Sequence, residues 1–124
     1  MATLTSQVKL DVSGITSDPI SVDKSFAYTA LAGGITSRSI NDNSAAGETI
    51  LLAAEYATGT VVYLRNREAA GGIVITIQLS AAAGGEVILQ GQEWCVFPWT
   101  TLVDILAFSA SGAPILEIGV FSAA

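Results

Sequence analysis

The sequence predicts an all-β protein, an antiparallel β-sandwich of jelly-roll-like form with about eight to ten short strands. Apolar and polar residues alternate with a period of two in several segments, which is typical of strands with one buried face. Turn residues recur roughly every 8 to 12 positions, as in sandwiches. Because no linker or internal repeat divides the 124 residues, a single domain over residues 1–124 is expected.

Two strands are predicted at the N-terminus. Residues 4–12 form a half-buried strand that stops at Ser13-Gly14, with Leu4, Val8, Leu10 and Val12 on its apolar face. After Asp18-Pro19, residues 20–28 alternate in the same way. Lys24 interrupts their apolar face, which fits an edge position or a bulge, and equally a side chain that reaches solvent.

The next segments are shorter. Gly33-Gly34 is expected to separate the second strand from a short polar strand at residues 35–40. Residues 41–47 form the most loop-like stretch of the chain. Residues 48–55 are predicted as a strand because Thr49 and Ile50 favour that state and the segment is short for a helix. A turn at residues 56–59 follows.

The central stretch, residues 60–99, is predicted as an antiparallel meander. Residues 73–79 place Ile73, Ile75, Ile77 and Leu79 on one face of a strand. Apolar runs at residues 61–64, 87–89 and 94–97 form the flanking strands. The connections at residues 68–72, 81–85 and 90–92 are short and carry glycine, which suits a reversing chain.

Two apolar segments complete the predicted fold. Residues 102–108 are apolar on both faces apart from Asp104, and residues 109–114 form a turn. In the last strand, residues 115–121, we expect Leu116, Ile118 and Val120 to point inward. Ile115 and Phe121 then point outward, toward a second sheet or a neighbouring subunit.

The composition favours assembly. Hydrophobic residues make up 51% of the chain and charged residues 13%, and the mean hydropathy is +0.57. No apolar run approaches the roughly 18 to 20 residues of a membrane helix. We therefore expect other subunits to cover part of the apolar surface, in a homo-oligomer.

The charge excludes two classes of partner. The net charge is −6, with five Lys and Arg residues and no histidine. An acidic chain with scattered basic residues offers no surface for nucleic acid or for anionic membranes. The first residues lack the positive region and apolar core of a secretory signal, and one cysteine excludes an internal disulfide.

No catalytic site is expected. Without histidine there is no Ser-His-Asp or Cys-His arrangement and no imidazole ligand for zinc. Cys95 has no basic neighbour in sequence and is interpreted as an inert buried thiol. Glu86 and Glu93 flank a predicted hairpin and offer a glycosidase pair, but ordinary solvated turn residues are the preferred interpretation. No cofactor is predicted.

Oxygen ligands occur together in one loop. Asn41, Asp42 and Asn43, followed by Glu48, offer a site for a hard cation. The glycine and the spacing of an EF-hand loop are missing, so a polar surface loop is preferred and no metal is predicted.

Two groups of residues are candidates for binding. Trp94 and Trp99, with Tyr63 and Tyr56, offer aromatic faces for sugar rings, although the parity that Trp94 shares with Val96 favours core packing for that ring. The candidates for subunit contact are Arg65, Arg67, Glu68, Arg38, Phe121 and Ile115. The charged cluster at residues 65–68, and Arg38 with it, are equally well explained as solvated strand positions.

The chain resembles a known class of protein. Its opening alternating strand, the segments VVYLRNRE, IVITIQL and EVILQGQEWCVFPW, and the closing ILEIGVF resemble small all-β virion proteins of tailed bacteriophages, which decorate or cement the head shell or form parts of the tail. The resemblance covers most of the chain. It implies a jelly-roll-like sandwich, self-association that is often trimeric, and a binding role on a capsid lattice without catalytic residues.

The expected function is therefore that of a capsid cement or decoration protein in a virion assembled in the host cytoplasm. It clamps neighbouring subunits of the major capsid protein by interface burial. A tail- or fibre-associated structural protein and a carbohydrate-binding module are the alternatives. Because terminal strands are easily exchanged, an N-terminal arm that reaches onto a neighbour is also expected.

Overall fold

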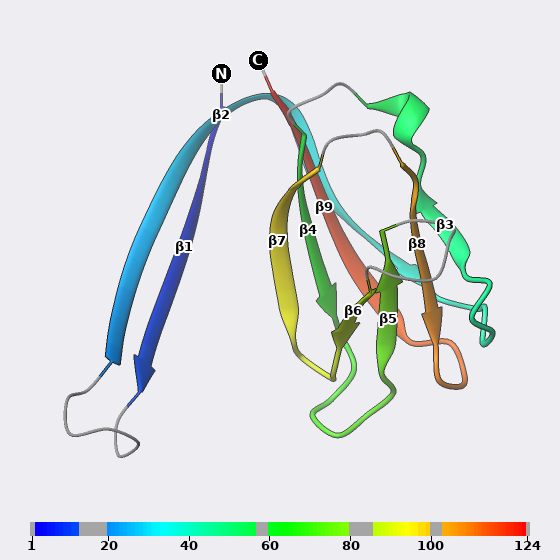
Figure 1. Ribbon diagram of the computed structural model, residues 1–124. Coiled ribbons are helices and arrows are strands. Elements are labelled where there is room, and N and C mark those ends of the chain that lie inside the picture. The colour runs from blue at the N-terminus through cyan, green and yellow to red at the C-terminus, as the bar shows by residue number, and fades with distance from the viewer. Residues whose placement is uncertain (1, 13–19, 57–59, 80–85, 100–102, 124) are drawn as a thin grey trace.

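The protein, described here from a computed structural model, is nearly all β-structure (Figure 1). The structure describes residues 2–12, 20–56, 60–79, 86–99 and 103–123. The strands within these ranges are β1 (Ala2–Val12), β2 (Ile20–Ser39), β3 (Glu48–Leu51), β4 (Thr60–Asn66), β5 (Ile75–Gln78), β6 (Glu86–Leu89), β7 (Trp94–Trp99), β8 (Ile105–Ser109) and β9 (Ile115–Ala123). The predicted all-β fold is confirmed. The turns predicted at residues 13–14, 18–19, 57–59, 81–85 and 100–101 lie outside the described residues.

Two antiparallel sheets form the sandwich. One has the strand order β1-β2-β9-β4-β7 and the other the order β3-β8-β5-β6. The prediction of a central meander is wrong, because β4 pairs with β7 and β9 while β5 pairs with β6 and β8 in the opposite sheet. The connections from β4 to β5 and from β6 to β7 cross between the sheets, so consecutive strands face each other across the core.

The core lies between the sheets. Ile75 and Ile77, predicted on a buried face, are fully buried, and so is Leu116. The buried cluster draws on both sheets and contains Ile40, Ile50, Leu51, Val62, Leu64, Ile75, Ile77, Leu89, Trp99, Ile105, Ala107, Leu116 and Ile118. The inward orientation predicted for alternate residues of the last strand is confirmed by the burial of Leu116 and Ile118 and by the packing of Val120 on this cluster.

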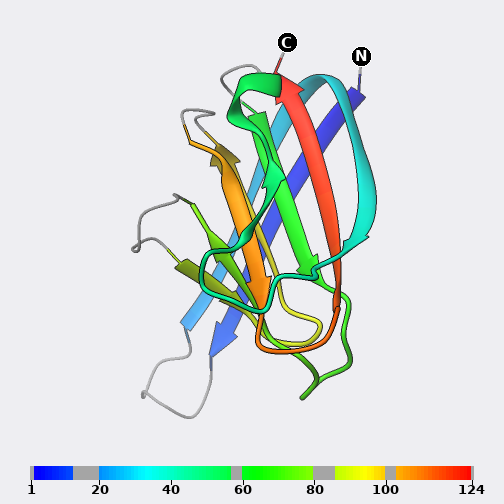
Figure 2. The same ribbon diagram turned by 90° about the vertical axis from the view of Figure 1, so that its right-hand side faces the viewer.

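A two-stranded β-ribbon projects from the sandwich. Its register runs from Ala2 opposite Ala30 to Val12 opposite Ile20. Beyond Ala30, β2 changes partner and pairs with β9 as far as Ser39 opposite Ile115. The ribbon therefore extends past strands β9, β4 and β7 of the five-stranded sheet, on the side of β7 in Figure 1, and it passes behind the sandwich in Figure 2.

This projection corrects two expectations. The burial predicted for the first strand fails at Val8, which is 44% exposed, because no second sheet among the described elements covers the ribbon there. Gly33-Gly34 does not end a strand, since β2 continues through both glycines. The register instead shifts between Ala30 and Ala32, where β2 exchanges β1 for β9.

Smaller differences concern two further segments. Lys24 lies in regular register opposite Val8, so no bulge occurs there, and no further described strand pairs with either edge of the ribbon at this position. The strand expected at residues 48–55 ends at Leu51 and gives way to a 3-10 helix, η1 (Ala53–Glu55). Asp104 accepts a hydrogen bond from the Ala53 backbone N–H at 2.8 Å and thereby holds the start of that helix.

Asn66 joins the two sheets at one end of the sandwich. This fully buried side chain donates from Nδ2 to the carbonyls of Ile73 and Leu89, at 2.8 and 2.9 Å, and accepts from the Glu68 backbone N–H at 3.0 Å. The backbone of Asn66 also pairs with Glu93 and Gln92. One side chain thus fixes both crossings between the sheets, and its place in the interior corrects its assignment to an exposed charged cluster.

Candidate functional site

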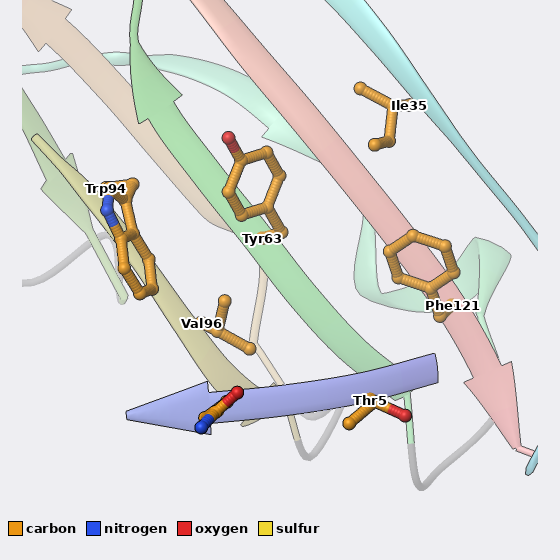
Figure 3. A pocket seen from close by; sticks show the side chains of 7 residues that line it. Thr5, Ile35, Tyr63, Trp94, Val96 and Phe121 are labelled. Atoms are coloured by element: carbon orange, nitrogen blue, oxygen red, sulfur yellow. The ribbon is translucent and has the colours of Figure 1, made fainter. Parts of the chain in front are cut away.

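An apolar hollow on the outer face lies between the ribbon and the rest of the five-stranded sheet. This groove has a volume of about 290 Å³. Its floor consists of outward-facing side chains of β2, β4, β7 and β9, namely Ile35, Tyr63, Trp94, Val96 and Phe121. Its roof consists of Thr5 and Gln7 of β1, which crosses over these strands (Figure 3). The groove therefore has an apolar floor and a polar roof.

The sheet register explains how the floor is assembled. Ile35, Gly119, Tyr63 and Val96 lie side by side in one row across four strands. In the next row, Glu117, Arg65 and Trp94 are neighbours. Because antiparallel partners point to the same face, a row of the sheet becomes a row of the floor.

Gly119 creates the depth of the groove. A methyl group at this position would lie 3.1 Å from ring atoms of both Phe121 and Tyr63. The missing side chain lets the two rings approach over the middle of β9, as expected where glycine interrupts a strand.

A polar network supports one wall of the groove. The Tyr63 hydroxyl donates to Glu117 at 2.8 Å, and Arg67 forms an ion pair with the second carboxylate oxygen at 2.8 Å. Burial raises the pKa of Tyr63, and the hydrogen bond to Glu117 raises it further. The same hydrogen bond lowers the pKa of Glu117, with a smaller contribution from Arg67. Glu117 is thus held ionised, and the Tyr63 ring is fixed in place.

A second hollow adjoins the groove and shares Tyr63 and Trp94 with it. Tyr63, Arg65, Gln92 and Trp94 line about 410 Å³. Arg65 donates to Gln92 Oε1 at 2.7 Å. Gln92 has a left-handed backbone (φ 73°) and donates from Nε2 to the carbonyls of Arg67 and Glu68, so the turn before β7 holds these polar groups beside the Trp94 ring.

The two tryptophans have opposite roles. Trp94 is 53% exposed on the groove floor, which contradicts the predicted core packing. Trp99 is 4% exposed, donates to the Val103 carbonyl at 3.0 Å and lies 5.6 Å from the Tyr56 ring, so it belongs to the core and is not a sugar-stacking residue. The five-residue spacing places the two rings on opposite faces of one strand, and Cys95, Phe97 and Trp99 occupy the inner face.

The candidate contact residues lie in three places. Phe121 lines the groove and Arg65 lines the adjoining hollow, where Gln92 donates to the carbonyls of Arg67 and Glu68. Ile115 is outward-facing and 37% exposed, at the far end of β9. Arg38 forms an ion pair with Glu48 at 2.7 Å and lines a separate hollow with Thr36 and Ile50. The set is therefore not one patch, and its predicted role in subunit contact stays a prediction.

The carboxylates considered for glycoside hydrolysis do not face each other across a hairpin. Strands β6 and β7 belong to different sheets, with Glu86 at the start of β6 and Glu93 beyond its end. Glu93 accepts a hydrogen bond from the Gln90 backbone N–H and caps that turn. Burial raises the pKa of the Cys95 thiol to about 11, which keeps it protonated and unreactive at neutral pH.

The loop considered for a cation is held by its own hydrogen bonds. Glu48 accepts from the backbone N–H groups of Asn41 and Asp42, and Asp42 accepts from Ser44. Asn43 donates to Ser109 and to the Gly112 carbonyl. Within the described ranges, no three acidic, cysteine or histidine side chains gather to hold a metal ion.

Sequence reasoning missed most of the groove. Ile35, Val96, Thr5, Gln7 and Gln92 were not singled out as site residues. The sequence did carry one signal for the groove. Gly119 interrupts a strand on the same outward-facing side as Phe121, two residues further on.

No protein-family model, curated protein or solved structure matches this chain. No helix in the described part of the chain is long and apolar enough to cross a membrane.

Proposed function

We propose that this chain is a non-catalytic structural protein that self-associates and binds a protein lattice, as a capsid cement or decoration protein does. The observation that carries this proposal is the groove floor, where Ile35 and Trp94 are 59% and 53% exposed beneath a projecting ribbon. A contiguous apolar surface of this kind is typical of a protein–protein interface.

The strand order supports the proposal through the fold class. Strands β2 and β9, β3 and β8, β4 and β7, and β5 and β6 each form an antiparallel pair. Rolling four such pairs into two sheets produces a jelly roll, an architecture used by viral capsid proteins and by lectins. The fold alone does not determine function, so this support is by analogy.

The composition supports the same function. A shell component works at high local copy number, where neighbouring copies raise the effective concentration and modest contacts hold firmly. In this proposal the partners are further copies of the chain, with a trimer favoured, and the major capsid protein. The location is the virion, after assembly in the host cytoplasm.

Electron microscopy of virus particles assembled with and without the chain tests this proposal. We expect regular density on the capsid surface, at a stoichiometry matched to the lattice, only when the chain is present. Density confined to the tail would favour the tail- or fibre-associated alternative. Particles that never retain the chain would contradict a virion role.

Carbohydrate binding is a second candidate function, favoured by the hollow at Trp94. There an exposed indole lies beside Tyr63, Arg65 and Gln92, which combines an aromatic face with planar hydrogen-bonding groups. Titration with polysaccharides is expected to change the fluorescence of the wild-type protein and not that of Trp94→Ala, which retains the buried Trp99. An unchanged wild-type spectrum would contradict this function.

A further inference from the structure

Arg65 differs from the other two arginines of the chain. Arg38 and Arg67 each form an ion pair with a glutamate, at 2.7 and 2.8 Å. Arg65 forms no ion pair with any described residue. It donates to the neutral amide oxygen of Gln92 at 2.7 Å, and its Nε is buried without a hydrogen-bond partner among the described residues. Because a half-buried cation is costly without a counter-ion, this guanidinium favours an anion from outside the chain.

Glu117 does not take the place of that anion, although it lies opposite Arg65 in the register of β9 and β4. One oxygen of its carboxylate accepts from the Tyr63 hydroxyl, and the other pairs with Arg67. The side-chain network beside the hollow thus holds two guanidinium groups and one carboxylate, which leaves one net positive charge in a chain of net charge −6. An anionic ligand complements this charge.

An aromatic surface lies directly beside the unpaired guanidinium. Arg65 and Trp94 are opposite each other on β4 and β7, which places their Cβ atoms about 4.5–5.5 Å apart. Both side chains line the hollow of about 410 Å³, and Trp94 is 53% exposed there. A ligand that stacks on the indole and also binds Arg65 therefore carries its acidic group directly on a ring, and not at the end of a long chain.

The adjoining groove has the two surfaces that a sugar ring requires. Its floor presents apolar side chains such as Val96 and Phe121, and its roof presents Thr5 and Gln7. A pyranose ring has an apolar C–H face, which stacks on apolar and aromatic groups, and hydroxyl groups that bind polar side chains. The groove volume of about 290 Å³ is at the lower end of the roughly 300–1,000 Å³ of ligand pockets, so the groove suits part of an oligosaccharide.

We infer that the ligand of this site is an acidic oligosaccharide, in which the sugar rings carry a carboxylate as uronic acids do. One sugar stacks on Trp94 and places its carboxylate on Arg65, and the next ring lies in the groove between the apolar floor and the polar roof. The inference rests on the carbohydrate-binding function proposed above and names its substrate class. An acidic peptide offers the charge without the ring, and a neutral sugar offers the ring without the charge.

Isothermal titration calorimetry on the wild-type protein provides the first test and needs no variant. The probes are oligomers of galacturonate and of mannuronate, the neutral methyl esters of both, and polyglutamate. We expect an acidic oligomer to bind about tenfold or more tightly than its ester, because only the acid forms charge-assisted hydrogen bonds with Arg65. Its affinity should fall as the salt concentration rises, and polyglutamate should bind more weakly than the acidic sugar.

Matched variants then locate the site. Arg65→Gln should weaken binding of the acidic oligomer by about tenfold or more and leave binding of the methyl ester unchanged. Arg38→Gln is the matched control, because it removes the same charge from a separate hollow, and its affinity should equal that of the wild type. Trp94→Ala should weaken binding of both the acid and the ester, since both stack on the same ring. Circular dichroism checks that each variant is folded.

The outcomes separate this inference from the function on which it rests. Equal affinity for the acidic oligomer and its ester overturns the acidic class and leaves carbohydrate binding intact. Polyglutamate that binds as tightly as the acidic sugar overturns the sugar ligand in favour of an acidic peptide. Equal losses in Arg65→Gln and Arg38→Gln show attraction by the overall charge and overturn the site. A wild-type protein that binds no sugar, acidic or neutral, overturns both proposals.

Discussion

Replacement of Asn66 by alanine should be the most damaging polar substitution in this domain. It removes two hydrogen bonds from Nδ2, to the carbonyls of Ile73 and Leu89, and one to Oδ1 from the Glu68 N–H. Each buried group left without a partner costs about 1–3 kcal/mol. Ile73 and Glu68 are half-buried and gain some water in return, whereas Leu89 is buried. We therefore expect a loss of about 3–5 kcal/mol in the free energy of unfolding.

Thermal unfolding followed by circular dichroism measures this effect. At about 2.1 cal/mol/K per residue, the unfolding entropy of 124 residues is about 0.26 kcal/mol/K, so Tm should fall by roughly 12–19 °C. Asn43→Ala is the matched control, because the Asn43 side chain also donates two hydrogen bonds but is exposed. Only one buried group, the Ser109 hydroxyl, loses a partner in this variant, so its cost should stay within about 1–3 kcal/mol and below that of Asn66→Ala.

The comparison of these two variants can refute the reasoning. If Asn66→Ala lowered Tm no more than Asn43→Ala, the buried hydrogen bonds of Asn66 would not hold the crossings between the sheets. Asn66→Asp sharpens the test, because it keeps the acceptor oxygen and loses both donors. It should be about as destabilising at neutral pH as the alanine variant, and it should recover in part in acid, where a protonated carboxyl donates one bond.

Three further predictions concern single groups. Gly91→Ala should destabilise the protein by at least about 1–3 kcal/mol in urea unfolding, because the added methyl group would overlap the Ala69 carbonyl oxygen, and equal stability would contradict the described turn. Because folding lowers the pKa of Glu117, this carboxylate stabilises the protein above its unfolded pKa of about 4.3, and the stabilisation is lost as the pH falls through the lower pKa of the folded state. Glu117→Gln should therefore show a shallower loss of Tm than the wild type below a pH of about 4.3. Parallel acid profiles of the two proteins would refute this. Cys95 should react with iodoacetamide at pH 8 far more slowly in the folded than in the unfolded protein, since its pKa is about 11, and equal rates would show an exposed thiolate.

The alternation of apolar and polar residues predicted most of the strands, whereas the pairing between strands is known only from the structure. Alternation of side chains identified Ile75 and Ile77 as core and Ile115 and Phe121 as outward-facing. It did not identify the sheet that each strand joins, because pairing depends on residues far away in the chain. Strands β4 and β5 are neighbours in sequence and lie in different sheets, and the pattern of a short strand is the same in either case.

The candidate site was harder to predict for a related reason. Alternation shows which residues of a strand share a face, but not which face is covered. Trp94 and Val96 were correctly placed together and assigned to the wrong side of β7. Val8 was assigned to a buried face and is 44% exposed, because the pattern of an apolar face is the same whether its cover comes from its own chain or from a neighbour.

The pairing of early strands with late ones has a kinetic consequence. Strand β9 lies between β2 and β4 and follows every other described strand in the chain. Apart from the local β1–β2 pairing, the five-stranded sheet therefore waits on contacts that close loops of tens of residues. Such non-local pairing slows folding to milliseconds or longer, as in other all-β domains. During that interval β2 and β4 keep open edges, so refolding yield should fall as protein concentration rises.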